Sequence, residues 1–518
     1  MAAWGIAGIA VALVDGPETV YAAGFGQARP ESVFRCGSIS KLLNALAVMQ
    51  LVEAGKLDLD APVDRYGEGL LPVNPFPNSA PVTLRQLLCH RSGFVREAPV
   101  GGYFDDSQPG LAPTLSSIAQ TVLVNPPNTR TRYSNAGPSL AGHLVERAAG
   151  AAFGQYQRER ILEPLGMTHP SWSLEDLPRG QLIPAFMRVA DGHGGFGRRQ
   201  APVFNLGAVP AGNLFTTAED LARFLGMLAA GGQGPGGRIL KTGSLAQMFT
   251  PQLTSEPGGY GLGFVVGKFR GHESVSHNGA VYGHSASLVF LPDARVGAVV
   301  LANEDLVNGR IQKLANLALS LMLAAGRAEE PPPAPVPLRL APNVLAPFCG
   351  DYESQSFWAE LTIEDGRLAA NISGQPTRLT PIGPSRFLAE SRVNESVPLD
   401  IECDAAGQVT GFTMGPQKFM RAHASRGDIP GPWRSYLGSF GPAFIPLVLS
   451  VRRGHLYAMT ENLADYRLTP VNRRVFAFPP GLYADEHLVF LGEGRGQTQK
   501  VDMANMILSR IPLSPILA

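Results

Sequence analysis

The stretch that decides the fold and the chemistry of this chain reads Phe34-Arg35-Cys36-Gly37-Ser38-Ile39-Ser40-Lys41. The apolar segment 42–54 follows directly and predicts a buried helix. Ser38 and Lys41 are three residues apart, so at the start of a helix their side chains share one face and can meet. A desolvated lysine loses its proton readily and can then activate a serine. The pair therefore predicts a nucleophile beside its base, whereas the plainer interpretation makes Ser38 an N-cap before a core helix.

Composition places the chain among globular proteins of ordinary polarity. The 518 residues are 45% hydrophobic and 17% charged, which leaves room for two to four domains. The formal net charge is +0, from 43 Lys and Arg against 43 Asp and Glu, so neither nucleic acid nor an acidic membrane is expected as a partner. No apolar run approaches about 20 residues, so no transmembrane helix is predicted.

The cysteines and the N-terminal segment bear on metal binding, redox chemistry and the cellular compartment. The four cysteines contain no C-x-x-C pair, so neither a zinc site nor a redox dithiol is indicated. Cys349 and Cys403 fall in one predicted domain, and a disulfide between them is left open. The first 14 residues are apolar but lack a basic segment, so they predict a core strand rather than a signal peptide. As written, the chain is therefore expected in the cytoplasm.

Residues 1–326 predict one α+β domain, with an antiparallel sheet flanked by helices. Residues 6–25 alternate like a β-hairpin. Further strands are expected at 261–266, 273–278, 285–291 and 296–302. Helices are expected at 42–54, at 83–88 with Thr83 as cap, at 139–149, after a capping box of Thr216 and Glu219, and at 308–325.

A proline-rich linker, 327–343, separates this domain from an internal repeat. The motifs Gly350-Asp-Tyr, Gly366-Arg-Leu and Arg378-Leu-Thr-Pro recur as Gly438-Ser-Phe, Gly454-His-Leu and Arg467-Leu-Thr-Pro. Both copies, 344–425 and 426–518, alternate apolar and polar residues and predict small antiparallel β-barrels, with a joint at 425–432. Neither copy contains a nucleophile motif, so both are interpreted as a scaffold or a lid.

Two further motifs could complete a site around Ser38. Tyr133-Ser134-Asn135 places a phenol and an amide on the same side of an extended segment. His277-Asn278-Gly279-Ala280 ends a predicted strand, where the glycine admits a substrate closely and the next N–H can bind an oxyanion. The plainer alternatives are an interfacial tyrosine and an exposed strand end. A third motif, Lys241-Thr242-Gly243, precedes a short amphipathic helix and is rejected as catalytic.

Ser38-x-x-Lys41, Tyr133-x-Asn135 and His277-Asn-Gly279, in this order, resemble the penicillin-recognising serine hydrolases. The branch they resemble most contains class C β-lactamases, D-aminopeptidases, D-alanyl-D-alanine carboxypeptidases and related esterases. Further blocks are similar to that branch at 34–41, 87–93, 161–167, 212–217 and 260–264. The two tandem β domains are similar to the layout of D-aminopeptidases.

The resemblance implies a β-lactamase/transpeptidase-like fold and an acyl-enzyme mechanism without metal or other cofactor. Ser38, both helix cap and nucleophile, would be acylated, while Lys41 and Tyr133 would share the proton transfers. The N–H groups of Ser38 and Ala280 would form the oxyanion hole. The implied substrate-binding residues are Asn135, His277, Gly279 and Ala280.

Two departures from the branch shape the functional hypothesis. His277 stands where β-lactamases carry lysine, and a neutral imidazole holds a carboxylate weakly, which favours peptidases and esterases. Only residues 1–4 remain of a helix that normally precedes the first strand, so a truncated start would imply an exported protein.

The hypothesis is hydrolysis of a small ester or short peptide, with a D-amino-acid peptide as the favoured amide. The alternatives are an esterase without peptidase activity, then a β-lactamase, and, from another class, an inactive module that binds peptides or cell-wall fragments. The oligomeric state stays open, with a homodimer as one option.

Overall fold

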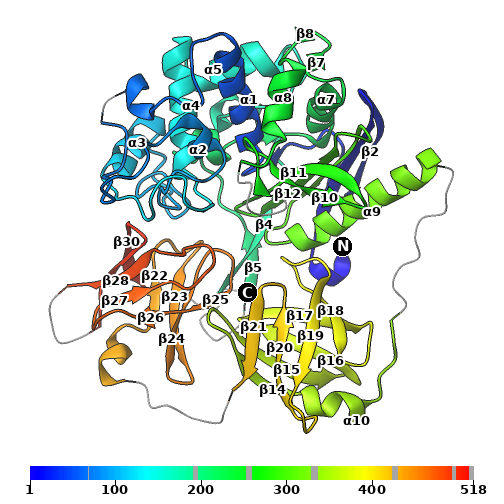
Figure 1. The fold of residues 1–518 in the computed structure, drawn as a ribbon, viewed down its shortest axis with the longest axis vertical. Coiled ribbons are helices and arrows are strands. Elements are labelled where there is room, and N and C mark those ends of the chain that lie inside the picture. Colours follow the sequence, from blue (N-terminus) through cyan, green and yellow to red (C-terminus); the bar gives the residue numbers. More distant parts are fainter. Residues whose placement is uncertain are drawn as a thin grey trace. The chain divides into compact units, whose positions relative to one another are not determined.

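The structure is a computed structural model that describes residues 1–67, 69–190, 196–252, 259–327, 337–422, 430–492 and 497–512. The chain divides into two compact units (Figure 1). The first comprises Met1–Met187 and Arg199–Glu330, and the second comprises Arg188–Arg198 and Pro331–Ala518. The predicted linker at 327–343 and the predicted joint at 425–432 lie largely outside the described residues. The domain boundaries drawn from the sequence therefore stay a prediction.

An antiparallel sheet lies at the centre of the first unit. Its strand order within the described residues is β2-β1-β13-β12-β11-β10-β9. The strands are β1 Gly8–Asp15, β2 Glu18–Gly26, β9 Gly259–Tyr260, β10 Val265–Phe269, β11 His272–Val281, β12 His284–Leu291 and β13 Val296–Ala302. The predicted hairpin forms β1 and β2, and β1 also pairs with β13. The sheet therefore joins the first strands of the unit to its last.

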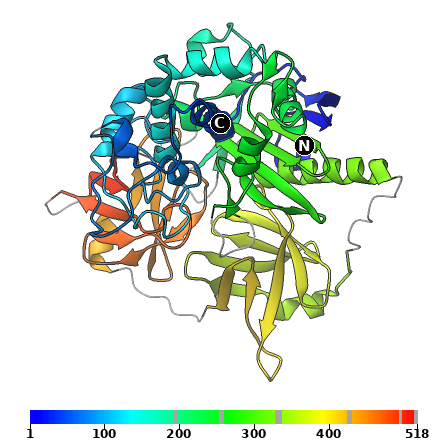
Figure 2. The same cartoon turned by 45° about the horizontal axis from the view of Figure 1, so that its top comes forward.

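Helices pack on both faces of this sheet. Alternate residues of a strand point to opposite faces, and β1 follows this rule. Ala10, Ala12 and Val14 pack into the core formed with α1 (Ser40–Glu53) and α7 (Ala218–Ala229). Ile9 and Val11 pack into a second core beneath α9 (Asn308–Arg327), the long yellow-green helix of Figure 2. The expected antiparallel sheet flanked by helices is confirmed.

Two helices of the first unit, α2 (Leu84–Leu88) and α7, begin at a side-chain cap. The unit also contains α3 Leu111–Ala119, α4 Ala136–Ala149, α5 Phe153–Gln157, α6 Val209–Gly212 and α8 Thr242–Met248. Thr83 caps α2 through a complete capping box, as predicted. The capping box predicted at Thr216 is wrong by one residue: Thr217 caps α7 and accepts from the Asp220 N–H. Thr216 lies one residue too early to cap, because it belongs to the short strand β6 (Phe215–Thr216), which pairs with β3 (Phe34–Arg35).

The second unit contains the two sequence repeats. The first repeat is a closed barrel of β14 Gly350–Glu353, β15 Trp358–Glu364, β16 Arg367–Ile372, β17 Gln375–Pro381, β18 Arg386–Glu390, β19 Val397–Cys403, β20 Val409–Met414 and β21 Gln417–Arg421. The second is a sheet of β22 Gly438–Phe440, β23 Leu447–Arg452, β24 His455–Met459, β25 Asp465–Arg467, β26 Thr469–Pro470, β27 Val475–Ala477, β28 His487–Leu491, β29 Lys500–Met503 and β30 Met506–Ile511. In each repeat the first strand pairs with both the second and the last.

The two repeats differ in closure. The strand that is continuous as β17 in the first repeat is interrupted at Leu468 in the second, between β25 and β26, so the second barrel is only nearly closed. The predicted pair of antiparallel β-barrels is otherwise confirmed. Cys349 and Cys403 are free thiols, so the disulfide that the sequence left open is not formed. Within the described ranges, no helix is long and apolar enough to cross a membrane.

Candidate active site

Ser38 lies on the turn between β3 and α1, where its side chain is partly exposed. The prediction that Ser38 caps the helix is wrong, because α1 begins at Ser40 and Ile39 occupies the N-cap position. The turn is closed instead by Ser40, whose Oγ donates to the Gly37 carbonyl at 2.6 Å. The Ser38 hydroxyl is therefore left to contact side chains from other elements.

Lys41 Nζ lies within hydrogen-bond distance of three oxygens. The distances are 2.9 Å to Ser38 Oγ, 2.7 Å to Asn135 Oδ1 and 2.8 Å to the Ala211 carbonyl. Burial lowers the pKa of Lys41 to about 7, against the opposing effect of the Glu97 carboxylate. A neutral amine has two N–H groups and one lone pair. Because Asn135 and Ala211 offer only acceptor oxygens, they take the two N–H groups and the lone pair faces Ser38.

Tyr133 supplies a second proton-handling group to the same serine. Its phenol donates to Ser38 Oγ at 2.6 Å. Burial raises the pKa of the phenol well above its usual value, so the phenol stays protonated at neutral pH. The ring packs against His90, with 4.3 Å between centroids, and His90 Nδ1 accepts from the Ser134 N–H. These contacts fix the phenol over the serine.

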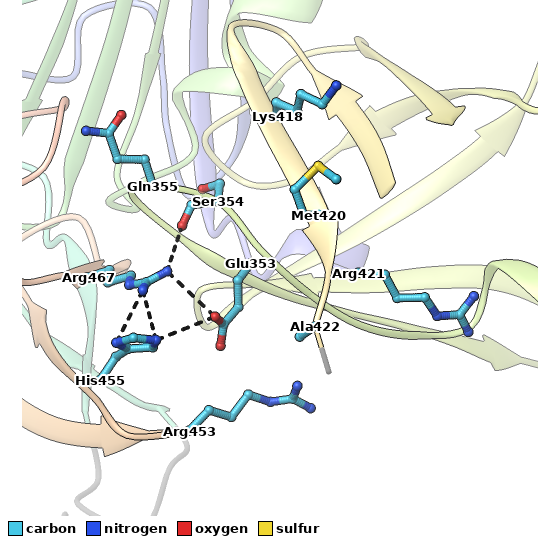
Figure 3. Close-up of a pocket in the computed structure, with 10 residues that line it drawn as sticks. All are labelled: Glu353, Ser354, Gln355, Lys418, Met420, Arg421, Ala422, Arg453, His455 and Arg467. Carbon is cyan, nitrogen blue, oxygen red and sulfur yellow. Dashed lines mark hydrogen bonds and ion pairs between the residues drawn. The ribbon is translucent and has the colours of Figure 1, made fainter. Parts of the chain in front are cut away.

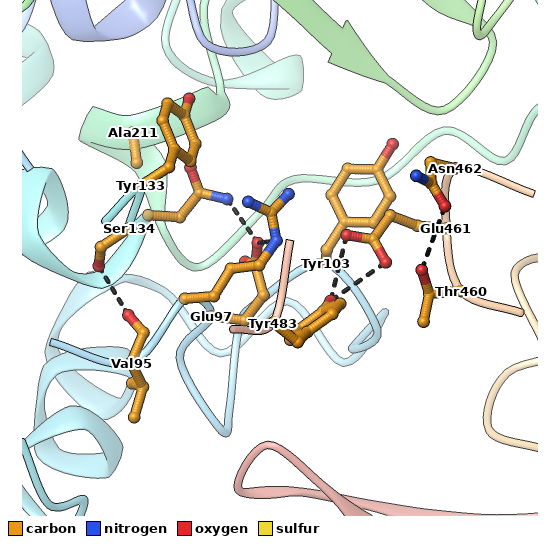
Figure 4. Close-up of polar contacts among 12 residues, drawn as sticks. Val95, Glu97, Tyr103, Tyr133, Ser134, Ala211, Thr460, Glu461, Asn462 and Tyr483 are labelled. Carbon is orange, nitrogen blue, oxygen red and sulfur yellow. Dashed lines mark hydrogen bonds and ion pairs between the residues drawn. The ribbon is translucent and has the colours of Figure 1, made fainter. Parts of the chain in front are cut away.

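Asn135 links Lys41 to a carboxylate that the sequence interpretation missed. Asn135 Nδ2 donates to Glu97 Oε1 at 2.6 Å. Figure 4 shows Glu97 together with Tyr133 and Ala211. Glu97 is 2% exposed, and its Oε1 lies 3.6 Å from Arg96 Nε. The loop that carries Glu97 matches no motif. The one available signal is the placement of two charged residues between Val95 and Ala98, since charges in an apolar run are often buried in pairs.

Two glycines bring β11 directly against the turn that carries Ser38. A Cβ at Gly279 would overlap the Cys36 carbonyl oxygen. A Cβ at Gly37 would lie 2.9 Å from the Ala280 nitrogen, and Gly37 also has a positive φ of 50°. The backbone of Ala280 therefore lies beside the Ser38 turn, where the sequence places the oxyanion hole.

His277 is buried rather than exposed at a strand end, with 4% of its surface accessible. Its Nδ1 lies 2.6 Å from the Asn278 carbonyl oxygen, which can only accept, so Nδ1 carries the proton. Nε2 is buried and has no hydrogen-bond partner among the described residues. Burial, with a smaller contribution from Lys41, lowers the pKa of His277 to about 4. At neutral pH the imidazole thus offers an uncharged acceptor.

A second polar cluster lines a cavity of about 460 Å³ in the second unit (Figure 3). Arg467 Nη2 donates to His455 Nε2 at 2.8 Å, and its Nη1 lies 3.6 Å from Glu353 Oε2. Lys418 Nζ lies 3.0 Å from Glu402 Oε2. The cavity is lined by Glu353, Ser354, Gln355, Lys418, Met420, Arg421, Ala422, Arg453, His455 and Arg467. Glu353 of the first repeat pairs with Arg467 and His455 of the second, whereas Lys418 pairs within the first repeat. The Ser354 Oγ bonds to nearby backbone groups. The cavity cluster therefore has no nucleophile–base pair.

Comparison with known proteins places the first unit in a family. The family profile described as Beta-lactamase matches residues 1–321. A beta-lactamase-like protein of Homo sapiens is 30% identical over 414 residues, which cover 74% of this chain and 76% of the relative. Penicillin-binding protein 4 of Amycolatopsis lactamdurans is 28% identical over 345 residues, 63% of this chain and 85% of the relative.

A solved structure extends the likeness to the second unit. The octameric penicillin-binding protein homologue from Pyrococcus abyssi matches with a TM-score of 0.56 and 24% identity, over 81% of this chain and 97% of that chain. At this level of identity the match establishes a shared fold. It agrees with the β-lactamase/transpeptidase-like architecture expected from the motifs.

Proposed function

The chain belongs to the beta-lactamase family of serine hydrolases, and on that premise we propose that it hydrolyses a small ester or amide through an acyl-enzyme on Ser38. The observation that carries the proposal is the double contact at Ser38 Oγ, 2.9 Å from Lys41 Nζ and 2.6 Å from the Tyr133 phenol. One group can take the serine proton, and the other can supply a proton to the leaving group.

Acylation follows from these contacts. Neutral Lys41 takes the hydroxyl proton as Ser38 Oγ attacks the substrate carbonyl carbon. The oxyanion that forms faces the N–H groups of Ser38 and Ala280. The intermediate then collapses, and the alcohol or amine leaves with a proton from Tyr133. The Lys41 ammonium returns its proton to the phenolate, so the site is neutral again.

Deacylation uses the same two groups, with water in place of Ser38 Oγ as the nucleophile. A water molecule attacks the acyl-enzyme carbonyl and passes a proton to Lys41. The second tetrahedral intermediate expels Ser38 Oγ, which regains a proton through Lys41 and Tyr133. The products are a carboxylic acid and the free enzyme, so one ester or amide bond and one water are consumed per cycle.

The chemistry of His277 bears on the substrate. A neutral Nε2 acceptor favours a substrate group that donates a hydrogen bond and gives a free carboxylate no positive charge to bind. This supports an ester, or a D-amino-acid peptide cleaved at its N-terminal side, as the substrate. An esterase without peptidase activity is the second candidate. A β-lactamase is the third, since β-lactams carry a carboxylate.

A substrate panel with one nucleophile variant tests the proposal. Wild type, Ser38→Ala and the exposed-helix control Ser116→Ala are assayed with p-nitrophenyl esters, D-alanine amides and nitrocefin. Wild type and Ser116→Ala are expected to turn over the esters or amides and to form a fluorophosphonate adduct. Ser38→Ala is expected to lose both. An adduct on another residue, or full activity of Ser38→Ala, would refute the assignment. Nitrocefin as the best substrate would reverse the substrate order.

A further inference from the structure

Glu97 places a buried carboxylate behind Asn135. We propose that Glu97 is a positioning residue: it fixes the Asn135 amide and keeps the Lys41 amine basic enough to accept the Ser38 proton. The inference rests on the function proposed above. It is carried by a continuous chain of contacts from Glu97 Oε1 through Asn135 and Lys41 Nζ to Ser38 Oγ, with distances of 2.6, 2.7 and 2.9 Å.

Glu97 decides which way the Asn135 amide points. A carboxylate can only accept, so it binds the amide NH₂ and leaves Oδ1 to face Lys41. A flipped amide would present Nδ2 to the Lys41 amine, placing donors against donors, and would present Oδ1 to a carboxylate oxygen. In the observed orientation Lys41 directs one N–H to Asn135 and one to Ala211, which leaves its lone pair for Ser38. The direction of proton transfer therefore depends on Glu97.

Glu97 also balances the effect of burial on Lys41. Lys41 is 2% exposed, and burial favours its neutral form. Glu97 is the larger of two charges that act on the pKa of Lys41 and raises it, whereas Arg96 lowers it. The other titratable groups around the amine are uncharged at neutral pH: His90, His277, Tyr133 and Tyr260. Without Glu97 the amine would be a weaker base, and a general base works best with a pKa near the working pH.

Two substitutions at Glu97 separate the hydrogen bond from the charge. In Glu97→Gln the new amide oxygen still accepts from Asn135, but the negative charge is lost. Glu97→Ala loses both. The second-order rate of Ser38 labelling by a fluorophosphonate is measured from pH 5 to 9 on the full chain. The melting temperature and the exposed-site control Glu159→Gln are measured in parallel.

Glu97→Gln is expected to shift the midpoint of the acid limb downward by about one pH unit, because a neighbouring opposite charge shifts a pKa by that order. Glu97→Ala is expected to show the same downward shift of the midpoint and, in addition, to label about tenfold more slowly on the plateau above it, since Asn135 also loses its buried acceptor. Arg96→Met removes the opposing charge and is expected to move the midpoint upward. A purely structural role would lower the rate and the melting temperature without moving the midpoint.

A second readout keeps this inference separate from the proposed function. The Lys41 13Cε resonance, assigned with Lys41→Arg in protein carrying 13C-labelled lysine, gives the same midpoint without any reaction at Ser38. No labelling of Ser38 in wild type would refute the proposed function, whereas a Glu97→Gln midpoint equal to wild type would refute the role of Glu97. If Glu97→Gln fails to fold, the midpoint of Glu97→Ala, which also lacks the charge, decides the matter by the same titration.

Discussion

The cluster around Ser38 and the cavity cluster of the second unit combine the same types of residue. Each brings a cation, a histidine and a glutamate together: Lys41, His277 and Glu97 in the first, and Arg467, His455 and Glu353 in the second. In the first cluster the cation and the histidine are 2% and 4% exposed. In the second, their side chains are 28% and 36% exposed.

The difference in exposure determines what each cluster can do. Where water reaches, opposite charges pair directly, and their mutual stabilisation is small. Where water is excluded, an ionised group is costly, so burial lowers the pKa of Lys41 to about 7 and that of His277 to about 4. A lysine that is half neutral at pH 7 can act as a base. The same residue types are thus suited to proton transfer in one place and form exposed ion pairs in the other.

Removing the cation from each cluster should give the largest difference in kcat/KM between the two clusters. Lys41→Met is expected to lower kcat/KM by about 10³-fold, because it removes the general base. Arg467→Met is expected to leave kcat/KM within about twofold of wild type. Steady-state kinetics on one p-nitrophenyl ester measures both. Comparable losses in the two variants would show that the cavity takes part in catalysis.

Gly279→Ala tests whether the close approach of β11 to the Ser38 turn matters. The added Cβ would overlap the Cys36 carbonyl and push the strand away, so kcat is expected to fall about 10²-fold through a displaced oxyanion donor. Gly267→Ala, on the adjacent strand β10, is the matched control, because its Cβ would make an ordinary contact with Ser274 at 3.6 Å. Equal kinetics for the two variants would contradict the oxyanion assignment.

The pH dependence of wild type should report the buried lysine. The proposed base is the neutral amine, so activity is expected to require the deprotonated form and to be lost as pH falls through the Lys41 pKa of about 7. Below the midpoint, kcat/KM is expected to fall about tenfold per pH unit. The Tyr133 phenol stays protonated from pH 5 to 9, so its titration does not change kcat/KM in that range. A flat profile between pH 5 and 8 would rule out Lys41 as the titrating base.

The smallest effect is expected at the rim of the cavity. Lys418→Gln breaks the pair with Glu402, whose side chains are 59% and 31% exposed. The expected cost is about 0.5 kcal/mol in the free energy of unfolding, and it should vanish at high salt. Urea denaturation at low and at high ionic strength measures it. A loss well above 1 kcal/mol in the free energy of unfolding would mean that water screens this exposed ion pair as little as it screens the buried groups around Ser38.

Much of the fold and the reacting core of the site could be predicted from local patterns. Alternating apolar residues identified the hairpin β1–β2, and Val296–Ala302 was predicted to the residue. The recurring Gly and Arg-Leu-Thr-Pro motifs predicted two barrels of one topology. Ser38, Lys41, Tyr133 and Asn135 were named because each belongs to a short motif whose side chains have recognisable chemistry. Capping was less reliable: Thr216 and Ser38 were both placed as caps, but tertiary contacts use those residues elsewhere.

The sequence by itself therefore determined the family, the order of the elements and the residues proposed to react. Only the tertiary structure decided which groups contact those residues and shift their pKa values. The Ala211 carbonyl belongs to the backbone and carries no side-chain signal, while Glu97 lies in a loop without a motif, and both reach Lys41 only through folding. The pKa of Lys41 and the protonated nitrogen of His277 depend on burial and on the direction of neighbouring dipoles. Those quantities arise from distances between residues that are far apart in the chain, so they first exist in the folded protein.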